Sequence, residues 1–292
     1  MIEVQKKRNT NNEELKFSII IPSWNNLEFL KLCIESIKKN SCFKHQIIVH
    51  VNEGNDGTVD WLKEQTDVDY TYSKENIGIC YALNIARQLL KTDYLLYMND
   101  DMYVLPEWDK FLNDEIEAIG NKNFFLSSTM IEPQTTNPAA IEFDCGKTLE
   151  NFDEKKLLEN FNNFQKENWN GATWPPNIVH KDIWDLVGGY SIEFTPGMYS
   201  DPDFSMKLWQ AGIRYFKGVG KSRVYHFAAK TTKRISKTTS GGYYKFIDKW
   251  GITSKTFTDK FLKRGKPFTG KLSEPEIDFF DKLNVKLKKI LR

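Results

Sequence analysis

The sequence predicts an α/β fold with a doubly wound, mixed but mostly parallel sheet that carries helices on both faces. Over the first hundred residues, apolar segments of strand length alternate with segments of helical periodicity, and the connections are short. Such alternation is typical of parallel sheets, whose strands need crossover connections. The 292 residues are 40% apolar and 27% charged, which is ordinary for a globular protein with a full core.

Strands are predicted where β-branched and other apolar residues cluster, and helices where apolar residues recur every three or four positions. Pro22 ends the first strand, and Thr58 is a plausible N-cap for the second helix. The predicted strands of the first part are 17–21, 47–51, 68–72, 94–98 and 124–130. The predicted helices are 26–40, 58–62, 79–90 and 108–116.

The later part of the chain is harder to interpret. Residues 131–176 are rich in Pro, Asn and Gly, and only a surface helix at 153–164 is predicted within them. Beyond them we expect helices at 182–187, 203–210, 243–250 and 274–292, and short strands at 215–216 and 223–226.

Charge and composition divide the chain into three parts. Residues 1–15 are a polar N-terminal tail that we expect to be frayed, and 16–229 form the main domain. Residues 230–292 form a basic, mostly helical C-terminal extension, with 17 Lys and Arg against 6 Asp and Glu, a net charge of +11, so the preceding residues carry −9. A basic extension suggests a diphosphate, an acidic membrane or a nucleic acid as partner; the alternative is a merely solvated tail.

The last predicted helix is amphipathic. Lys282, Lys286 and Lys289 lie off its apolar face, which consists of Ile277, Phe280, Leu283, Leu287 and Leu291. The preferred interpretation is packing on its own domain. The alternatives are a partner helix and peripheral contact with an anionic membrane surface.

Cysteine usage and the chain start predict a cytoplasmic protein, either soluble or peripheral at a membrane surface. The four cysteines are scattered without a CxxC pair, which argues against a zinc ribbon or a disulfide scaffold. The N-terminus has no apolar signal region, and no apolar run is long enough to cross a bilayer.

The most informative segment is the predicted strand at 94–98 and the acidic turn after it. Asn99, Asp100 and Asp101 follow the strand directly. Strand ends in open α/β sheets face the ligand crevice, and carboxylates placed there favour a divalent cation, which would in turn hold a diphosphate. The alternative is a solvated acidic turn.

Several short motifs occur in a characteristic order. They are residues 19–25, 55–58, 76–84, 99–101, 188–190 and 201–203, and His226. Together they resemble the family 2 glycosyltransferases of the GT-A fold, over about residues 16–250. The resemblance implies a nucleotide-binding half at 16–130 and an acceptor half at 131–229.

The resemblance also implies a donor site for a nucleoside diphosphate sugar. Asp101 and His226 would hold Mn²⁺ or Mg²⁺. The family's base-recognising Asp is absent after Val51, so Asn52 or Asp56 would substitute, and the donor base stays open, with uridine as the default. The other implied donor residues are Pro22, Trp24, Asn76, Gly78, Asn99 and Asp100. Lys233 and Arg234 suggest a basic loop that closes over the diphosphate, or else a plain linker.

On the acceptor side, the resemblance makes Asp201 the general base, although Ser200 replaces the family's usual Glu. A carboxylate suits this role because a sugar hydroxyl is a poor nucleophile until its proton is removed. The predicted acceptor-binding residues are Trp174, Gly189, Tyr190 and Asp203, of which Asp203 is also a natural acid for a helix N-terminus.

The resemblance therefore implies a metal-dependent, inverting transferase that moves a sugar to a hydroxyl of a glycan or other glycoconjugate, as in polysaccharide biosynthesis. Departures at Val51, Asn99 and Ser200 leave a non-catalytic sugar- or nucleotide-binding protein as an alternative. A nucleotidyltransferase is a second alternative, since it shares the sheet and the metal. No nucleic-acid recognition motif is present, so no nucleic-acid partner is expected. The sugar, the acceptor and the oligomeric state stay open.

Overall fold

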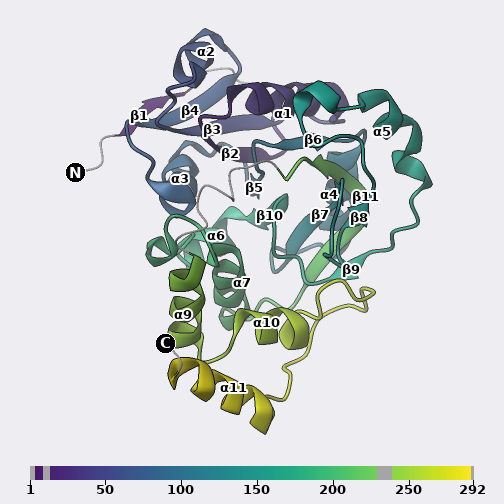
Figure 1. Ribbon diagram of the computed structural model, residues 1–292. Helices are drawn as coiled ribbons and strands as arrows, with labels where there is room; N and C mark the ends of the chain where they lie inside the picture. The colour runs from purple at the N-terminus through teal and green to yellow at the C-terminus, as the bar shows by residue number, and fades with distance from the viewer. Residues whose placement is uncertain (1–3, 9–13, 229–238, 291–292) are drawn as a thin grey trace.

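The computed structural model describes residues 4–8, 14–228 and 239–290, and its centre is one mixed β-sheet with helices on both faces (Figure 1). Four parallel strands form its first part, in the spatial order β4 (Val68–Ser73), β3 (Gln46–Asn52), β2 (Ser18–Trp24) and β5 (Tyr94–Tyr97). The crossover helices are α1 (Leu27–Asn40), α2 (Thr58–Glu64) and α3 (Gly78–Ala86), the last continued by a 3₁₀ turn, η1 (Arg87–Leu89). The strand–helix alternation predicted from the sequence is confirmed.

The second part of the sheet contains antiparallel strands that the sequence did not reveal. β10 (Asn177–His180) lies antiparallel between β5 and β7 (Phe125–Glu132). β11 (Phe216–His226) runs parallel to β7, and β6 (Met102–Val104) pairs antiparallel with β11. The short strands β8 (Ile141–Glu142) and β9 (Trp169–Asn170) flank β7 and β11. The helices of this part are α4 (Trp108–Ile119), α5 (Glu154–Asn160), α6 (Lys181–Leu186) and α7 (Ser200–Gln210).

β11 replaces the two short strands predicted at 215–216 and 223–226. It is one strand with a register shift between Val219 and Arg223. The continuous strand was not predicted partly because Gly218 interrupts its apolar residues. A glycine is required there, since a Cβ atom would lie 1.8 Å from the ring of Trp169. The strand therefore has no side chain at the position that Trp169 of β9 covers.

The N-terminal segment is more ordered than predicted. Val4–Lys7 forms β1, an edge strand antiparallel to β4. The Lys7 ammonium donates hydrogen bonds to the carbonyl oxygens of Leu62, Lys63 and Gln65 at the end of α2. The expectation of a frayed tail is therefore wrong for these four residues, because backbone pairing and a helix C-terminus hold a sequence with no apolar signal of its own.

Two apolar cores lie on the two faces of the sheet. Ile19 and Ile21 of β2 point into a core with Leu30 and Ile34 of α1, whereas Ile20 between them points into the opposite core. That second core collects residues of α3, α6 and α7 and of the C-terminal segment. Alternation along one strand between two cores is what a sheet covered on both faces requires.

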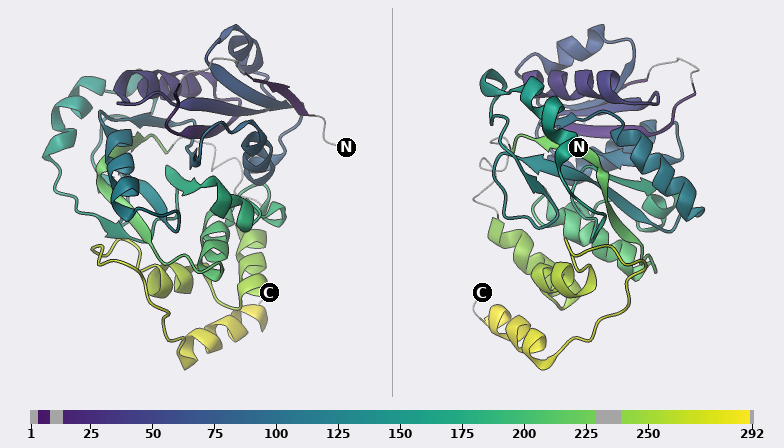
Figure 2. Two further views of the ribbon diagram at one scale, coloured as in Figure 1. Left: turned by 180° about the vertical axis from the view of Figure 1, so that it is seen from behind. Right: turned by 90° about the vertical axis from the view of Figure 1, so that its right-hand side faces the viewer.

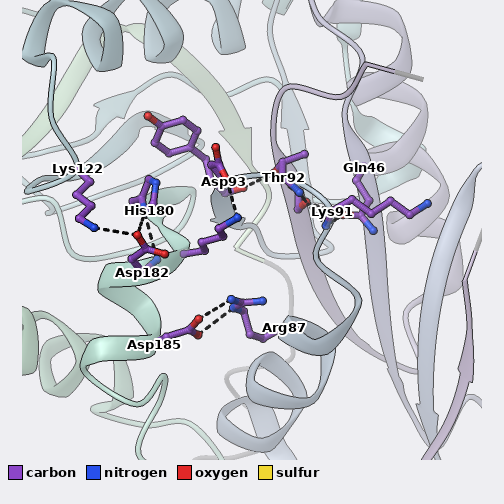
Figure 3. Close-up of polar contacts among 12 residues, drawn as sticks. Gln46, Arg87, Lys91, Thr92, Asp93, Lys122, His180, Asp182 and Asp185 are labelled. Atoms are coloured by element: carbon purple, nitrogen blue, oxygen red, sulfur yellow. Dashed lines mark hydrogen bonds and ion pairs between the residues drawn. The ribbon is translucent and has the colours of Figure 1, made fainter. Parts of the chain in front are cut away.

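Ion pairs fix α6 at the edge of the sheet where β5 begins (Figure 3). Arg87 of η1 makes a bidentate ion pair with Asp185, with nitrogen–oxygen distances of 3.1 and 2.6 Å. Lys122 pairs with Asp182 at 2.8 Å, and Lys181 pairs with Asp93 at 2.6 Å. These contacts anchor the turn from β10 into α6 at the edge opposite the strand ends that carry Asp100 and Asp101.

The C-terminal segment lies at the end of the molecule remote from α2 (Figure 2). It comprises α9 (Thr239–Trp250), α10 (Ser254–Thr256), a π-helical turn (Phe257–Phe261) and α11 (Phe279–Ile290). Phe246, Phe257 and Leu262 are buried in the core beneath α7. Among the described residues, no helix is both long and apolar enough to cross a membrane.

α11 does not bury the face that the sequence singled out. Val285 is buried, but Leu283 and Leu287 are 38% and 49% exposed, and Phe280 is 77% exposed. The preferred interpretation, in which the whole apolar face packs on its own domain, is therefore wrong for these three residues. Polar contacts hold the helix instead, among them Lys260 with Asp281.

Candidate active site

A cavity of about 760 Å³ opens at the carboxyl ends of β2, β3 and β5. Its other walls are the turn before α7 together with the start of that helix, the 174–175 segment, and residues 254–264 of the C-terminal segment. The fold brings these site residues predicted from the sequence into the cavity wall: Pro22, Trp24, Asn52, Asn76, Gly78, Asn99, Asp100, Asp101, Trp174, Asp201 and His226.

Asp100 and Asp101 form the acidic end of β5. Both are buried, with 7% and 6% of their surface exposed. Burial and the neighbouring charge of Asp101 raise the pKa of Asp100 to about 7, although the polar side chains of Ser23 and Asn26 lower it. Two adjacent carboxylates that resist joint ionisation favour a positive charge beside them.

His226 supplies that charge in the structure. Its Nε2 lies 3.5 Å from Oδ1 of Asp101, and its Nδ1 lies 2.8 Å from Oε1 of Glu132. Burial disfavours the imidazolium, but Asp101 and Glu132 outweigh it and raise the pKa of His226 to about 10. The pairing of β11 with β6 sets His226 opposite Met102 and therefore next to Asp101.

Glu132 is a site residue that the sequence analysis missed. It ends β7, two residues beyond the strand predicted there, and its carboxylate orients the imidazole of His226. An acidic residue at the end of a buried strand is the same signal that singled out Asp101. The signal was hidden because the strand end was placed too early.

The donor groups at this point suit a divalent metal such as Mn²⁺. Asp101 offers a carboxylate and His226 an imidazole nitrogen in a buried site that attracts positive charge. Within residues 4–8, 14–228 and 239–290, no three His, Cys, Asp or Glu side chains are gathered as a metal-ligand group. Asp101 and His226 are the predicted ligands that lie together at this point, with Nε2 of His226 3.5 Å from Oδ1 of Asp101.

The loop after β4 is fitted closely to the turn before α7. The Asn52 side chain accepts a hydrogen bond from the amide of Ile77 at 2.9 Å, and that of Asn76 accepts one from Gly78 at 2.9 Å. Gly78 has φ +76°, and a Cβ atom there would lie 2.8 Å from the Cα of Pro196. A glycine is needed at this point, since backbone meets backbone in the cavity wall.

Of two residues predicted to bind the donor nucleoside, Trp24 lines the cavity and Asp56 does not. The indole Nε1 of Trp24 donates to Oε2 of Glu53 at 2.9 Å, and the ring lines the cavity. Asp56 is not among the cavity-lining residues of the described chain. Its carboxylate accepts from the amides of Leu27 and Thr58, at 2.7 and 3.2 Å, so it caps the starts of α1 and α2.

Asp201 faces the cavity from the first turn of α7. Burial raises its pKa to about 7, although the hydroxyl of Tyr190, which donates to Oδ1 at 2.9 Å, lowers it. A carboxylate with a pKa near neutrality can accept a proton at physiological pH and remains basic enough to do so. Its position in the cavity wall and its pKa are compatible with the general-base role predicted for it.

Three predicted acceptor-binding residues lie outside the cavity wall of the described chain. Tyr190 is buried and reaches the site only through Asp201, and Gly189 packs against Asn84, where a Cβ atom would meet Oδ1 at 2.3 Å. Asp203 is fully buried and accepts from Lys249 Nζ at 2.9 Å and from Trp250 Nε1 at 2.8 Å, so it joins α7 to α9.

Two further predictions lie outside the described residues. Lys233 and Arg234, expected to close over the diphosphate, belong to the 229–238 segment.

Comparison with known sequences identifies the family. The sequence matches the model described as "Glycosyl transferase family 2" over residues 18–174, which is more than half of the chain. It is 35% identical over 92 residues to the uncharacterized glycosyltransferase YfnE of Bacillus subtilis (strain 168), covering 30% of this chain and 24% of that protein. It is 25% identical over 223 residues to a teichoic acid poly(glycerol phosphate) polymerase of Staphylococcus epidermidis, covering 73% of this chain and 28% of the polymerase. The chain thus spans about a quarter of the length of these curated relatives.

Solved structures show the same fold at low identity. The structure of GalNAc-T7 with UDP, GalNAc and Mn²⁺ superimposes with a TM-score of 0.55 at 15% identity, over 73% of this chain and 43% of that chain. Residues 1–349 of S. aureus TarS in complex with UDP-GlcNAc give a TM-score of 0.53 at 15% identity, over 74% of this chain and 61% of that chain. These likenesses confirm the predicted GT-A-type architecture. With the family match and the arrangement of the cavity, they lead to one conclusion: the chain belongs to glycosyl transferase family 2.

Proposed function

We propose that this protein transfers a sugar from a nucleoside diphosphate sugar, by default a uridine diphosphate sugar, to a hydroxyl group of a glycan or other glycoconjugate. The observation that carries the proposal is that two acidic features line one cavity. One is the Asp201 carboxylate, whose pKa is about 7, and the other is the buried pair Asp100 and Asp101 at the end of β5. The first suits proton removal from a hydroxyl, and the second suits a metal-bound diphosphate.

In the proposed reaction, Asp201 takes the proton from the acceptor hydroxyl as its oxygen attacks the anomeric carbon. Attack from the side opposite the diphosphate inverts the configuration at that carbon. Tyr190 holds the Asp201 carboxylate through the hydrogen bond to Oδ1. Trp24, Asn52 and Asn76 line the part of the cavity nearest β2 and β3, where the nucleoside would lie.

Asp101 and His226 would hold the metal, Mn²⁺ or Mg²⁺, with Asp100 beside them. When bound, such a metal offsets the negative charge that develops on the leaving diphosphate. Glu132 would keep the His226 ring oriented through its Nδ1.

Similar proteins support the donor class, the metal and the role in polymer synthesis. TarS residues 1–349 bind UDP-GlcNAc, and GalNAc-T7 is known with UDP, GalNAc and Mn²⁺, which favours a uridine donor and a metal. A relative is a teichoic acid poly(glycerol phosphate) polymerase, which favours a role in the synthesis of a polymer.

The experiment that tests the proposal is a panel of nucleoside diphosphate sugars incubated with Mn²⁺ and followed by chromatography of the released nucleotide. Metal-dependent release of UDP from one UDP-sugar supports it. Release of pyrophosphate from a nucleoside triphosphate would instead identify a nucleotidyltransferase. Binding of UDP without any turnover, over long incubation and with many acceptors, would indicate a non-catalytic binder.

Tyr190→Phe should change the pH dependence of turnover. Asp201 acts as a base only when ionised, so kcat/KM should rise about tenfold per pH unit below a pKa of about 7 and level off above it. Because the Tyr190 hydroxyl stabilises the ionised carboxylate, its removal raises the pKa, and the rising limb should move to higher pH by roughly one unit. Rates measured from pH 5 to 9 check this; an unchanged profile with a uniformly lower rate would contradict it.

We also propose that α11 makes peripheral contact with an anionic membrane surface. Phe279, Phe280 and Ile290 are 71%, 77% and 79% exposed, and Lys286 and Lys289 are exposed on the same short helix. Exposed aromatics beside lysines are typical of interfacial helices. Co-sedimentation with phosphatidylglycerol vesicles should fall at least severalfold in the Phe279→Ser, Phe280→Ser double variant. Equal sedimentation of both proteins would argue against the contact.

A further inference from the structure

Arg264 is a cation in the cavity wall whose side chain the proposed chemistry does not use. It comes from the C-terminal segment, and its guanidinium carbon lies 3.8 Å from the centroid of the Trp174 ring. Both residues line the cavity. The stacked guanidinium covers one face of Trp174, so that face is closed to a sugar ring, contrary to the simplest form of the acceptor role predicted for this residue.

The backbone around Arg264 is held firmly. Its amide donates to the carbonyl oxygen of Thr258 at 3.0 Å, and the Gly265 amide donates to Asn170 of β9 at 2.9 Å. At Gly171, a Cβ atom would lie 2.7 Å from the Cα of Arg264, so the two backbones are in close contact. Residues 264–268 thus extend the edge of β9, and the position of Arg264 is set by the fold.

The hydrogen-bonding capacity of this guanidinium is unused by the described protein. No hydrogen bond or ion pair to it is found within residues 4–8, 14–228 and 239–290, and its Nε is buried without a partner. Asp259, an acidic neighbour that also lines the cavity, pairs with Lys255. A guanidinium carries five N–H donors in a planar fork that matches a carboxylate or a phosphate.

Arg214 shows the difference between this arrangement and a structural one. Its guanidinium also stacks on a tryptophan, 3.9 Å from the Trp209 ring. However, its donors are taken up by the carbonyl oxygens of Trp209 and Ile213 and by Glu274, at 2.6, 3.0 and 3.1 Å. Arg264 has the same stacking but faces the cavity with its donors free of such bonds.

The sheet order places Arg264 away from the donor residues. β5 lies between β2, which ends in Trp24, and β10, which begins shortly after Trp174. The carbonyl oxygen of Trp174 accepts from Ser127 of β7, beyond β10. An anion at Arg264 would therefore lie on the β10 side of the cavity, whereas the nucleoside side is at β2 and β3.

We propose that Arg264 binds an anionic group, a phosphate or a carboxylate, of the acceptor, so that the acceptor is a negatively charged glycoconjugate or polymer. This inference rests on the proposed function, because it takes transfer to an acceptor hydroxyl as given. Trp174 is a positioning residue that holds the plane of the guanidinium, and the guanidinium selects the acceptor by charge and shape.

The experiment measures binding of two anionic probes at constant ionic strength, a glycerol phosphate oligomer and an oligosaccharide with glucuronate, against a neutral glucose oligomer. The wild-type protein should prefer one anionic probe, and which one distinguishes phosphate from carboxylate. Arg264→Gln should weaken binding of that probe about ten- to a hundredfold, and Arg264→Lys, which keeps the charge but not the fork, should lie between. Arg214→Gln is the matched control and should bind like the wild type.

UDP with Mn²⁺ is measured in parallel in every variant, and the unfolding temperature shows that each is folded. Unchanged UDP affinity in Arg264→Gln is expected. Loss of UDP affinity in that variant would place Arg264 at the donor and overturn the proposal. Equal binding of the anionic probe by wild type and Arg264→Gln, or no binding by the wild type, would also overturn it. Failure of the wild type to bind any nucleotide would instead count against the proposed function.

Discussion

Asp201→Asn should lower kcat for sugar transfer by about a hundred- to ten-thousandfold while leaving donor binding almost unchanged. The carboxylate is the proposed acceptor of the hydroxyl proton, and an amide of the same shape cannot take that proton at neutral pH. The variant still accepts the hydrogen bond from Tyr190, so the geometry of the site is kept. Transfer rates and UDP affinity, measured on the same preparation at pH 8, check the prediction.

The stability of the same variant separates catalysis from folding. The folded-state pKa of Asp201, about 7, lies above the unfolded value of about 3.9, so between these values the folded state binds more protons and loses stability as pH rises. At pH 8 the neutral amide removes that penalty, and Asp201→Asn should unfold at the wild-type temperature or above. Asp203→Asn, two residues along α7, should instead lower stability and leave the transfer rate unchanged. It weakens the ion pair with Lys249, which should cost roughly 1–3 kcal/mol of the free energy of unfolding. A wild-type rate in Asp201→Asn would remove this residue from the mechanism.

Asp101→Asn should lower kcat about a thousandfold or more and should also abolish the effect of Mn²⁺ on UDP affinity. The carboxylate is the proposed anionic metal ligand, and loss of several kcal/mol of charge stabilisation corresponds to this change in rate. Calorimetric titration with UDP, with and without Mn²⁺, measures the second effect independently of turnover.

The control for this variant is another buried aspartate that contacts a histidine. Asp109 of α4 lies 3.0 Å from Nε2 of His45 and accepts hydrogen bonds from the amides of Cys42 and Phe43, and it does not line the cavity. Asp109→Asn should lower the free energy of unfolding by roughly 1–3 kcal/mol and leave the Mn²⁺ effect in place. If both variants lose the effect of Mn²⁺ on UDP affinity, the loss reflects a disturbed fold, and the role proposed for Asp101 is not supported.

The sequence predicted the parallel part of the sheet well because each unit there is local. A strand such as Ser18–Trp24 and the helix after it carry strong, separate periodicities, and neighbours in the chain are neighbours in space. The acidic end of β5 was therefore placed correctly, and the family resemblance followed from motifs attached to these strand ends.

The antiparallel strands were missed because long-range pairing creates them. Asn177–His180 and Met102–Val104 are too short to show a periodicity, and each is a strand only because β5 and β7, or β11, lie beside it. Glu132 and Arg264 were missed for related reasons. One lies past a misplaced strand end, and the other reaches the cavity only because its segment pairs with β9.

Sequence spacing alone could not show which of the two aspartates at the start of α7 faces the cavity. Asp201 and Asp203 both lie in the first turn of α7, but two residues are about 200° apart around a helix. One carboxylate therefore faces the cavity, and the other is buried against Lys249 and Trp250. No property of either residue by itself shows which is which, because the phase of the helix is set by tertiary packing.

The pairing of residues 264–268 with β9 has a consequence for the order in which the enzyme is made. The strand ends that carry Trp24, Asn52 and Asp101 are synthesised early, and N-terminal units of a chain can fold while the ribosome is still working. The wall that contains Arg264 is made after them. A nascent chain would then have a nucleotide pocket before it has a complete place for the acceptor, so that a bound donor is exposed to water on that side until translation has passed this segment.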